Sequence, residues 1–490
     1  METTIPTTIV IFGATGDLTE RKLIPALYNS YCKQRLPQEF YIVGYARRPW
    51  SDDKFRQHLY EGMAEFGPGE DIFDPDEWES FARRLRYVQG DLETEEDFEN
   101  LRRFLSELEG GPANRLYYLA IAPRFFVPVI ENLGAADMVR EAEGWRRIVI
   151  EKPFGHDLES AQELNEAVHA VFDEHQIYRI DHYLGKETAQ NIHYFRFANT
   201  IFEPVWTRNY VDNVQITVME NVDVGHRAGY YDQAGVVRDM FQNHLLQLLS
   251  LVAMEPPASF EADAVRNEKV KLLSSIRPID LSDTVRAQYQ GYCETEGVAP
   301  GSQTPTFAVI KLFVDNWRWK DVPFYLRSGK ALAAKNTEIN IEFQKPPHLM
   351  FEHMVEEDFT PNILSLCIQP DEGIHLKLQA KVPDSRQMRS VDMEFHYRTS
   401  FKDNSLPDAY ERLLLDAIRG DASLFTRSDG IEAAWRLVDP VIHGWETEPD
   451  APPLATYEPG SWGPAEAAEL MARDCHVWRY GCGQQQAASV

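Results

Sequence analysis

The sequence predicts two domains, an α/β domain built on a parallel sheet and then a larger α+β domain with a mainly antiparallel sheet. The chain has 490 residues, which is more than one hydrophobic core usually covers. Up to about residue 180, continuous apolar runs alternate with helix-like segments, a pattern typical of parallel strands joined by helices. Beyond that point the strand-like segments alternate apolar and polar residues, as in an antiparallel sheet with one covered face.

The first domain, expected over residues 1–180, begins with Thr8–Phe12, a continuous apolar run typical of a strand buried on both faces. A helical pattern follows over residues 18–34, a second helix is expected after Ser51, and the acidic segment Glu93–Leu108 also has a helical pattern. The other strands expected in this domain are Phe40–Gly44, Leu85–Val88, Leu116–Ala120 and Arg147–Ile150. Helices between successive strands predict a parallel, doubly wound sheet.

The second domain is expected over residues 181–490, and its strands should have one polar face. Helical patterns at Val236–Met254 and Asp408–Arg419 are expected to cover the apolar face of its sheet. The proline- and glycine-rich segment Pro449–Pro464 predicts a loop. The alternating segments that predict its strands are Asn213–Val218, Phe307–Phe313, Glu338–Phe343, Ile374–Leu378 and Val391–Phe395.

The charge of the chain excludes some classes of partner. Its 49 basic and 77 acidic side chains give a formal net charge of −28, which disfavours binding to nucleic acid or to an anionic membrane. The longest apolar stretch, Leu245–Met254, is too short to cross a bilayer, and no basic segment precedes the first apolar run, so no secretory signal is expected. We therefore expect a cytoplasmic protein in which any anionic ligand has its own basic pocket.

The five cysteines, at positions 32, 293, 367, 475 and 482, are scattered and odd in number. This pattern favours reduced thiols over a disulfide framework. Cys475 and His476, with Cys482 nearby, form a weak metal-binding pattern, but no second pair of ligands follows. No bound metal is therefore expected.

A glycine turn, Gly13-Ala14-Thr15-Gly16-Asp17-Leu18, connects the first expected strand to the first helix. Glycines there allow a tight turn and let the backbone approach a pyrophosphate at the helix N-terminus, as in a Rossmann-type domain. The spacing departs from the usual G-x-G-x-x-G, and an ordinary strand-to-helix turn is the alternative. The position after the first strand of an alternating chain favours dinucleotide binding. The candidate residues are Gly13, Thr15, Gly16, Asp17 and Leu18.

The end of the second strand predicts which coenzyme is bound. An acid at this position would bind the 2′-hydroxyl of the adenine ribose, but the strand is followed by Arg47 and Arg48. Two guanidinium groups suit a 2′-phosphate, so the predicted cofactor is NADP rather than NAD. A solvated basic loop is the alternative, and the position at the end of the second strand argues against it.

The segment Arg179–Glu187 combines polar groups that core packing does not require. His182, Tyr183 and Lys186 offer hydrogen-bond donors and positive charge that suit a phosphate. Asp181 is one residue away and can orient another group. If these side chains converge, they form an anion-binding site with an acid beside it.

His244 and Lys152 are two further candidates. His244 lies in the expected helix Val236–Met254, where a buried core histidine is the alternative, but Asp181 is an available partner. A carboxylate bonded to one imidazole nitrogen fixes the tautomer and leaves the other nitrogen as a base. Lys152 follows an apolar strand, at the edge where α/β sheets bind ligands, although a surface lysine is the alternative there. Pro153 fixes a turn that can contain a cis bond.

Taken together, these segments resemble the glucose-6-phosphate dehydrogenase family along nearly the whole chain. The most specific is Arg179–Glu187. The other matching segments are Gly13–Leu23, Glu151–Gly155, Asp212–Thr217, Arg238–Gln247, Val322–Lys330, Gln369–Gly373 and Pro459–Pro464.

The resemblance implies roles in catalysis and substrate binding. His244 would take the proton from the C1 hydroxyl of the sugar, and Asp181 would hold His244 and stabilise its imidazolium. The 6-phosphate would be bound by His182, Tyr183 and Lys186. The residues implied to contact the rest of the sugar are Lys152, Glu220, Asp239, Lys330 and, where some members carry arginine, Lys335.

The resemblance also implies the coenzyme site. Gly13 and Gly16 would belong to the coenzyme fingerprint, and Arg47 matches the arginine at the 2′-phosphate of NADP. Lys152 would lie near the nicotinamide as well as the sugar. The further residues expected at the 2′-phosphate are Thr15 and Arg48.

The implied reaction is oxidation of the C1 hydroxyl of D-glucose 6-phosphate to 6-phosphogluconolactone with hydride transfer to NADP, the first step of the oxidative pentose phosphate pathway. One base and good positioning suffice for it, so no metal is needed. The family forms homodimers and homotetramers through the large sheet. The alternatives are another Rossmann sugar or inositol oxidoreductase with a Glu-Lys-Pro segment, which would not need the phosphate-binding side chains, and a non-catalytic NADP-sensing protein, which would not need Asp181 and His244.

Overall fold

The structure is a computed structural model that describes residues 5–67, 73–348, 350, 360–401 and 406–482. The chain divides into two compact units. The first unit comprises residues 1–185, 259–266 and 407–432, and the second comprises residues 186–258, 267–406 and 433–490. The two later segments of the first unit were not part of the predicted division into residues 1–180 and 181–490.

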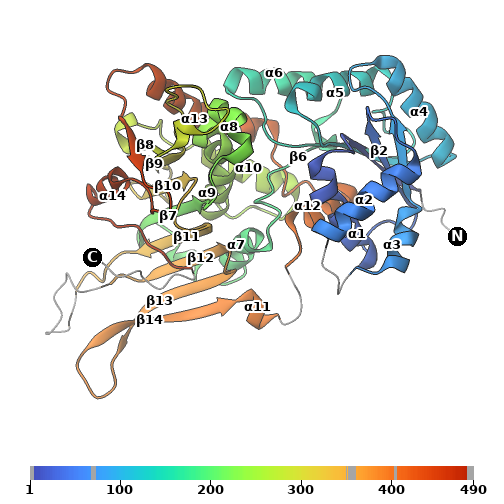
Figure 1. The fold of residues 1–490 in the computed structure, drawn as a ribbon. Coiled ribbons are helices and arrows are strands. Elements are labelled where there is room, and N and C mark those ends of the chain that lie inside the picture. Colours follow the sequence, from blue (N-terminus) through green and yellow to red (C-terminus); the bar gives the residue numbers. More distant parts are fainter. Residues whose placement is uncertain (1–4, 68–72, 349, 351–359, 402–405, 483–490) are drawn as a thin grey trace. The chain divides into compact units, whose positions relative to one another are not determined.

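The first unit is built on a parallel sheet (blue to cyan in Figure 1). In its described part, six strands pair in the order β3-β2-β1-β4-β5-β6, and every pair is parallel. The predicted Rossmann-type α/β domain is therefore confirmed. The strands are β1 Thr7–Phe12, β2 Phe40–Ala46, β3 Leu85–Gln89, β4 Asn114–Leu119, β5 Arg146–Ile150 and β6 Ile177–Arg179.

Helices connect these strands, and particular residues mark where some of them begin and end. Asp74 caps one helix by accepting a hydrogen bond from the backbone N–H of Asp76 at 2.8 Å, and Gly110 ends another in the left-handed conformation. The helices are α1 Ile24–Cys32, α2 Asp52–Phe66, α3 Pro75–Ala82, α4 Glu95–Glu109, α5 Phe126–Ala135 and α6 Leu158–His169. The shorter elements are the π-helix η1 Thr19–Leu23 and the 3₁₀ turns η2 Pro123–Phe125 and η3 Glu174–Gln176.

Helix α12, Ala409–Arg419, belongs to the first unit, so the prediction that it covers the antiparallel sheet was wrong. Its Leu413 and Leu414 are buried in the core of the parallel-sheet unit, and Lys33 pairs with Glu411 at 2.8 Å. Figure 1 shows α12 in orange beside the blue α1. An amphipathic pattern shows that a helix buries one face, but it does not show which surface that face contacts.

The second unit contains a mixed sheet. Nine strands of its described residues pair in the order β14-β13-β12-β11-β7-β10-β9-β8-β15. Two pairs, β10 with β7 and β15 with β8, are parallel and the others are antiparallel, so the predicted mainly antiparallel sheet is confirmed. The strands are β7 Val211–Met219, β8 Thr284–Tyr289, β9 Phe307–Phe313, β10 Pro323–Gly329, β11 Asn336–Phe343, β12 Ile363–Gln369, β13 Gly373–Lys381, β14 Met388–His396 and β15 Leu454–Tyr457.

Strand β15 lies inside Pro449–Pro464, so the prediction of a loop there was wrong for four residues. It pairs only with β8, at the edge of the sheet. Edge strands tolerate neighbouring proline and glycine because one side of the strand makes no ladder hydrogen bonds.

The expected helix over Val236–Met254 consists of two parts. Its first part, η6 Val237–Leu245, is a π-helix, and α9 Leu246–Ala253 continues it as an α-helix. Residues of η6 contact β7 and β10, so this segment covers the sheet as predicted. Hydrophobic periodicity does not reveal a π-helix, a rare element that is frequent at functional sites.

The remaining helices complete the described chain. They are α7 Glu187–Phe197, α8 Ala228–Val236, α10 Ala262–Leu273, α11 Tyr397–Ser400, α13 Ser428–Thr447 and α14 Ala465–Ala472, with the 3₁₀ turns η4 Glu203–Val205, η5 Gly225–Arg227, η7 Leu281–Asp283 and η8 Tyr292–Glu294. Among the described helices, none is both long and apolar enough to cross a membrane.

The structure corrects the prediction of five reduced thiols. Cys367 of β12 forms a disulfide with Cys482, while the other three cysteines, all described, are free. The partners are 115 residues apart, a separation from which no pairing can be deduced. Both ring nitrogens of His476 contact other side chains, Nδ1 with Tyr325 at 2.9 Å and Nε2 with Asp212 at 3.0 Å.

Candidate active site

The glycine turn after β1 has the geometry of a phosphate-binding turn. Gly13 has a φ of +82°, and a Cβ at this position would lie 2.2 Å from the carbonyl oxygen of Ala120, so no side chain fits. Its N–H donates to the carbonyl of Tyr45 at 2.9 Å, and the N–H of Gly16 donates back to Gly13 at 2.9 Å. Helical structure begins at Asp17. A ligand phosphate can therefore approach the backbone closely at a helix N-terminus.

The other predicted residues of this turn differ in exposure. Thr15 is half-buried and Asp17 is exposed. Leu18 packs against the core of the first unit, so its side chain is directed into the protein. Leu18 can contribute only backbone groups to a bound coenzyme.

Arg47 and Arg48 are exposed directly after β2. The backbone there is held because Tyr87 Oη donates to the carbonyl of Arg48 at 2.6 Å and Gln89 Nε2 donates to that of Arg47 at 3.3 Å. The Arg48 guanidinium lies 5.1 Å from the centre of the Trp50 ring. Because β2 pairs with β1, these two cations lie at the same edge of the sheet as the glycine turn. The residues fit NADP.

Lys152 follows β5 at the same edge of the parallel sheet, and the Lys152–Pro153 bond is cis. The sequence indicates no role for Glu151, the residue before it. Tyr118 Oη donates to Glu151 Oε1 at 2.6 Å, and burial raises the pKa of Glu151. This buried hydrogen bond fixes the backbone from which Lys152 projects.

The segment that begins with Arg179, the last residue of β6, contains buried and half-buried side chains. Arg179 is buried and structural, since it pairs with Glu174 at 2.8 Å. Asp181 is 2% exposed, and its Oδ1 accepts a hydrogen bond from the backbone N–H of Tyr183 at 2.9 Å. The ring of the half-buried His182 lies 5.0 Å from that of Tyr183. The carboxylate of Asp181 is thus held in one orientation.

Lys186 occupies the N-cap position of α7 in the second unit. The side chain of Lys186 makes no capping hydrogen bond to this helix, and the N–H groups and dipole at the start of a helix favour an anion. The Lys186 ammonium donates to Gln369 Oε1. Gln369 lies in one of the segments that carry the family resemblance, but an isolated glutamine gave no signal for a role.

Lys330, Glu220 and Asp239 are brought together in the second unit. Gly329 and Met219 are partners in the parallel pair of β10 and β7, so the next residues, Lys330 and Glu220, lie side by side. Their side chains form an ion pair, and Asp239 of η6 lies 3.6 Å from the Lys330 ammonium. That ammonium lies 5.0 Å from the centre of the Tyr231 ring. The cluster offers donors and acceptors that suit sugar hydroxyls.

His244 is 1% exposed and lies in the π-helix η6. Its predicted partner Asp181 belongs to the first unit, so the pairing of the two stays a prediction. Lys335 is exposed between β10 and β11. Its contact with substrate also stays a prediction.

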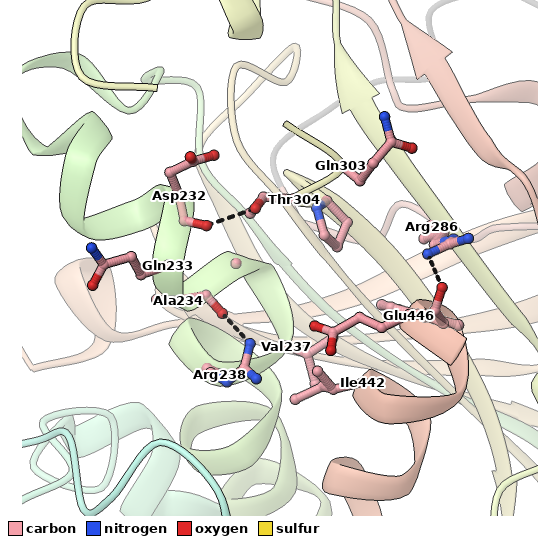
Figure 2. Close-up of a pocket in the computed structure, with 13 residues that line it drawn as sticks. Asp232, Gln233, Ala234, Val237, Arg238, Arg286, Gln303, Thr304, Ile442 and Glu446 are labelled. Atoms are coloured by element: carbon pink, nitrogen blue, oxygen red, sulfur yellow. Dashed lines mark hydrogen bonds between the residues drawn. The ribbon is translucent and has the colours of Figure 1, made fainter. Parts of the chain in front are cut away.

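A cavity of about 440 Å³ lies in the second unit beside the start of η6 (Figure 2). Arg238 Nη1 donates to the carbonyl of Ala234 at 3.4 Å, and Arg286 Nη1 donates to that of Trp445 at 2.6 Å. None of the predicted site residues lines this cavity. The cavity is therefore distinct from the Lys330–Glu220–Asp239 cluster.

These features define a class of protein. The parallel sheet carries a glycine turn and basic residues for a dinucleotide, and the second unit carries a polar cluster that suits a sugar. This is the arrangement of a Rossmann-type oxidoreductase that uses a nicotinamide dinucleotide.

Comparison with known proteins identifies the family. The family profile described as "Glucose-6-phosphate dehydrogenase, NAD binding domain" matches residues 10–191, and "Glucose-6-phosphate dehydrogenase, C-terminal domain" matches residues 193–479. The chain belongs to the glucose-6-phosphate dehydrogenase family, as the sequence predicted.

Individual relatives agree with this assignment. The chain is 44% identical to glucose-6-phosphate 1-dehydrogenase 2 of Mycobacterium bovis, over 97% of this chain and 94% of the relative. It is 43% identical to glucose-6-phosphate 1-dehydrogenase of Chlamydia pneumoniae, over 97% of this chain and 96% of the relative. A solved structure of glucose-6-phosphate dehydrogenase in complex with its substrate glucose-6-phosphate matches with a TM-score of 0.90 at 35% identity, covering 98% of this chain and 100% of that one. The enzyme from Mycobacterium avium matches with a TM-score of 0.84 at 37% identity, with the same coverage.

Proposed function

We propose that this chain oxidises the C1 hydroxyl of D-glucose 6-phosphate to 6-phosphogluconolactone and passes the hydride to NADP. The observation that carries the proposal is the similarity to glucose-6-phosphate 1-dehydrogenases over 97% of the chain. The chemistry of the predicted site residues agrees with it. The reaction would be the first step of the oxidative pentose phosphate pathway.

His244 is the proposed general base. Its neutral imidazole takes the proton of the C1 hydroxyl while hydride leaves C1, so that a neutral lactone forms. Asp181 is proposed to accept a hydrogen bond from the other ring nitrogen and to stabilise the imidazolium. Two observations support these roles: Asp181 is buried with its Oδ1 held by the N–H of Tyr183, and His244 lies in a π-helix.

The 6-phosphate is proposed to bind His182, Tyr183 and Lys186, which fall within five consecutive residues. The ammonium of Lys186 supplies charge, and the first turn of α7 supplies backbone N–H groups. Together they provide the local positive site that an anionic substrate needs on a chain with a net charge of −28.

The rest of the sugar is proposed to contact the cluster at the ends of β7 and β10. The carboxylates of Glu220 and Asp239 accept hydrogen bonds from hydroxyl groups of the sugar, and the Lys330 ammonium donates to hydroxyl oxygens of the sugar. The ion pair within the cluster supports the proposal because it holds these groups in place before substrate binds. The two further proposed contacts are those of Lys152 and Lys335.

NADP is proposed to bind at the carboxyl edge of the parallel sheet and supplies the nicotinamide C4 that accepts the hydride. Gly13 and Gly16 let its pyrophosphate approach the backbone, and Arg47 binds the 2′-phosphate with help from Arg48. Lys152 lies near both ligands in this proposal. The remaining contributions are those of Thr15 and of the helix start at Asp17 and Leu18.

Initial rates of reduced-coenzyme formation test the proposal. The purified chain is assayed with glucose 6-phosphate and with glucose, each with NADP and with NAD. We expect the highest kcat/KM for glucose 6-phosphate with NADP, at least about a hundredfold above glucose, because a buried charged contact contributes several kcal/mol. Equal rates with both sugars would favour a different sugar oxidoreductase, and NADP binding without turnover would favour an NADP-sensing protein.

The cellular location and the oligomeric state of the enzyme are also proposals. Glucose 6-phosphate and NADP are charged, water-soluble metabolites, and we place the enzyme with them in the cytoplasm. We propose a homodimer or homotetramer formed through the large sheet. Cell fractionation and light scattering of the purified chain test these statements; membrane-bound activity or a monomer at working concentration would contradict them.

A further inference from the structure

The hairpin formed by β13 and β14 (orange in Figure 1) places two histidines on one face of the second unit's sheet. His375 of β13 lies directly opposite Glu394 of β14 in the antiparallel register. His396 is two residues beyond Glu394 along β14, and side chains two residues apart point to the same face of a strand. Asp371 lies just before β13, next to this end of the hairpin. Four polar side chains therefore gather at one point.

The atoms that could bind a metal lie close together. Asp371, His375 and His396 each offer one ligand atom, and these three atoms lie within 4.8 Å of one another. His396 Nδ1 lies 3.2 Å from Asp371 Oδ1, and the two imidazole rings are 5.0 Å apart between centres. All of these side chains line one cavity of about 810 Å³, which leaves space for an ion beside them.

His375 provides a second, independent indication of a ligand. It is 8% exposed, and its buried Nε2 has no hydrogen-bond partner among the described residues. Buried polar atoms are nearly always paired, because an unpaired one costs about 1–3 kcal/mol. A metal ion bound to His375 Nε2 would remove this penalty.

The chemistry of the ligands indicates the kind of ion. Zinc binds imidazole nitrogen and carboxylate oxygen at about 2.0–2.2 Å, which separates neighbouring ligand atoms by about 3.4 Å. His396 Nδ1 and Asp371 Oδ1, which hydrogen-bond each other at 3.2 Å, already have about this separation. One ligand atom of His375 lies within 4.8 Å of both. Two imidazoles favour zinc, cobalt or nickel over magnesium or calcium, which prefer oxygen ligands.

Glu394 supplies the support that metal-bound histidines usually have. Its Oε2 lies 3.3 Å from His396 Nε2, the ring nitrogen that would not bind the metal. A carboxylate at that position fixes the ring orientation and makes the ligand more basic. The neighbouring Lys377 pairs with Asp392 at 2.9 Å, so its charge is compensated.

We propose that Asp371, His375 and His396 form a binding site for a divalent transition-metal ion, zinc foremost, with a water molecule as fourth ligand. The ion ties the loop before β13 to the end of β14. It takes no part in the dehydrogenase reaction, and the proposal does not depend on that reaction.

Zinc binding to the full-length protein tests the proposal. The protein is stripped with a chelator, and its affinity for Zn²⁺ is measured by competition with a chromophoric chelator, with Co²⁺ absorption as a second readout. We expect His375→Gln and His396→Gln each to weaken Zn²⁺ binding at least about tenfold. His443→Gln, a change at an exposed histidine of α13, is the matched control and should leave the affinity unchanged.

Thermal unfolding keeps the test decisive if one variant folds poorly. Zn²⁺ should raise the melting temperature of the wild-type protein but not that of the His375→Gln variant. If a histidine variant does not fold, Asp371→Asn, a change at a less buried position, takes its place. The proposal is overturned if the wild-type protein binds no Zn²⁺ more tightly than these variants do. It is also overturned if the His443→Gln variant loses as much affinity as His375→Gln.

Discussion

Lys330 shows how a single charged side chain is prepared for a polar ligand. Its ammonium pairs with Glu220, lies 3.6 Å from Asp239 and rests 5.0 Å from the centre of the Tyr231 ring. A long side chain that is already held loses less conformational entropy when a ligand binds. The pair forms because two parallel strands end at the same level, so residues 110 positions apart become neighbours.

At the same scale, Arg47 is expected to determine the choice of coenzyme. Arg47→Ala should raise the KM for NADP by about tenfold or more, because a charge-assisted hydrogen bond to the 2′-phosphate is lost. The KM for NAD should change little. Initial-rate measurements with both coenzymes check this, with Arg83→Ala, at the exposed residue that follows α3, as control. Equal changes for the two coenzymes would remove Arg47 from the 2′-phosphate site.

Lys186 is expected to determine recognition of the phosphate. Lys186→Ala should lower kcat/KM for glucose 6-phosphate by at least about tenfold and leave the much lower value for glucose unchanged, since only the phosphate contact is lost. Lys271→Ala, at an exposed lysine of α10, is the control. If the ratio between the two sugars stays as in the wild-type enzyme, Lys186 does not bind the phosphate.

Parts of the candidate site could be predicted from sequence, and the reasons are local. Gly13 stands out because a turn between strand and helix needs a residue without a side chain, and Arg47 stands out because its position follows a strand end. Residues that contact the candidate site only through long-range packing could not be recognised in the sequence. Gln369, which accepts from Lys186, and Tyr118, which donates to Glu151, are ordinary residues in the sequence.

At the scale of elements, the strands were predictable where apolar residues recur regularly. Phe307–Phe313 coincides with β9, whereas β6 has only three residues and β15 lies among prolines and glycines. The packing partner of α12 could not be predicted, because a helix pattern specifies a buried face and not its neighbour. The π-helical form of η6 was likewise hidden, since its residues have the apolar pattern of an α-helix.

The helix α7 carries a histidine that should make the fold sensitive to acid. Burial, together with Lys269 and Arg196, lowers the pKa of His193 to about 3. The unfolded chain binds a proton near pH 6.5, so the folded state loses stability as the pH falls below that value, by about 1.4 kcal/mol per pH unit.

Replacing His193 tests whether this histidine causes the loss of stability at low pH. In His193→Gln, the loss of unfolding free energy between about pH 7 and about pH 5 should be smaller by about 2 kcal/mol than in the wild-type protein. Urea unfolding at the two pH values measures it, with His443→Gln as control. An unchanged difference between the two pH values would show that His193 does not titrate as inferred.

At the scale of the whole molecule, the charge of −28 explains why substrate and coenzyme need local basic sites. The sites proposed for them combine backbone geometry with side-chain charge, at the glycine turn after β1 and at the start of α7. A chain of this length also needs long-range ties. The disulfide between Cys367 and Cys482 joins β12 to the C-terminal segment.

Removing that disulfide is expected to lower stability. Cys482→Ser should reduce the unfolding free energy by about 2–4 kcal/mol without reductant, because a loop of 115 residues is no longer closed in the unfolded state. With reductant present, variant and wild-type protein should be alike. Cys293→Ser, at an exposed free thiol, is the control. Titration of five free thiols in the unreduced, unfolded protein would show that the bond does not form.

The most direct test of the proposed reaction is the turnover of His244→Asn measured beside its binding of glucose 6-phosphate. If His244 is the general base, kcat falls by about two to four orders of magnitude, while the Kd for glucose 6-phosphate stays within about threefold of the wild-type value. His443→Asn should retain full activity. Near-normal turnover in His244→Asn would show that some other group removes the proton from the C1 hydroxyl.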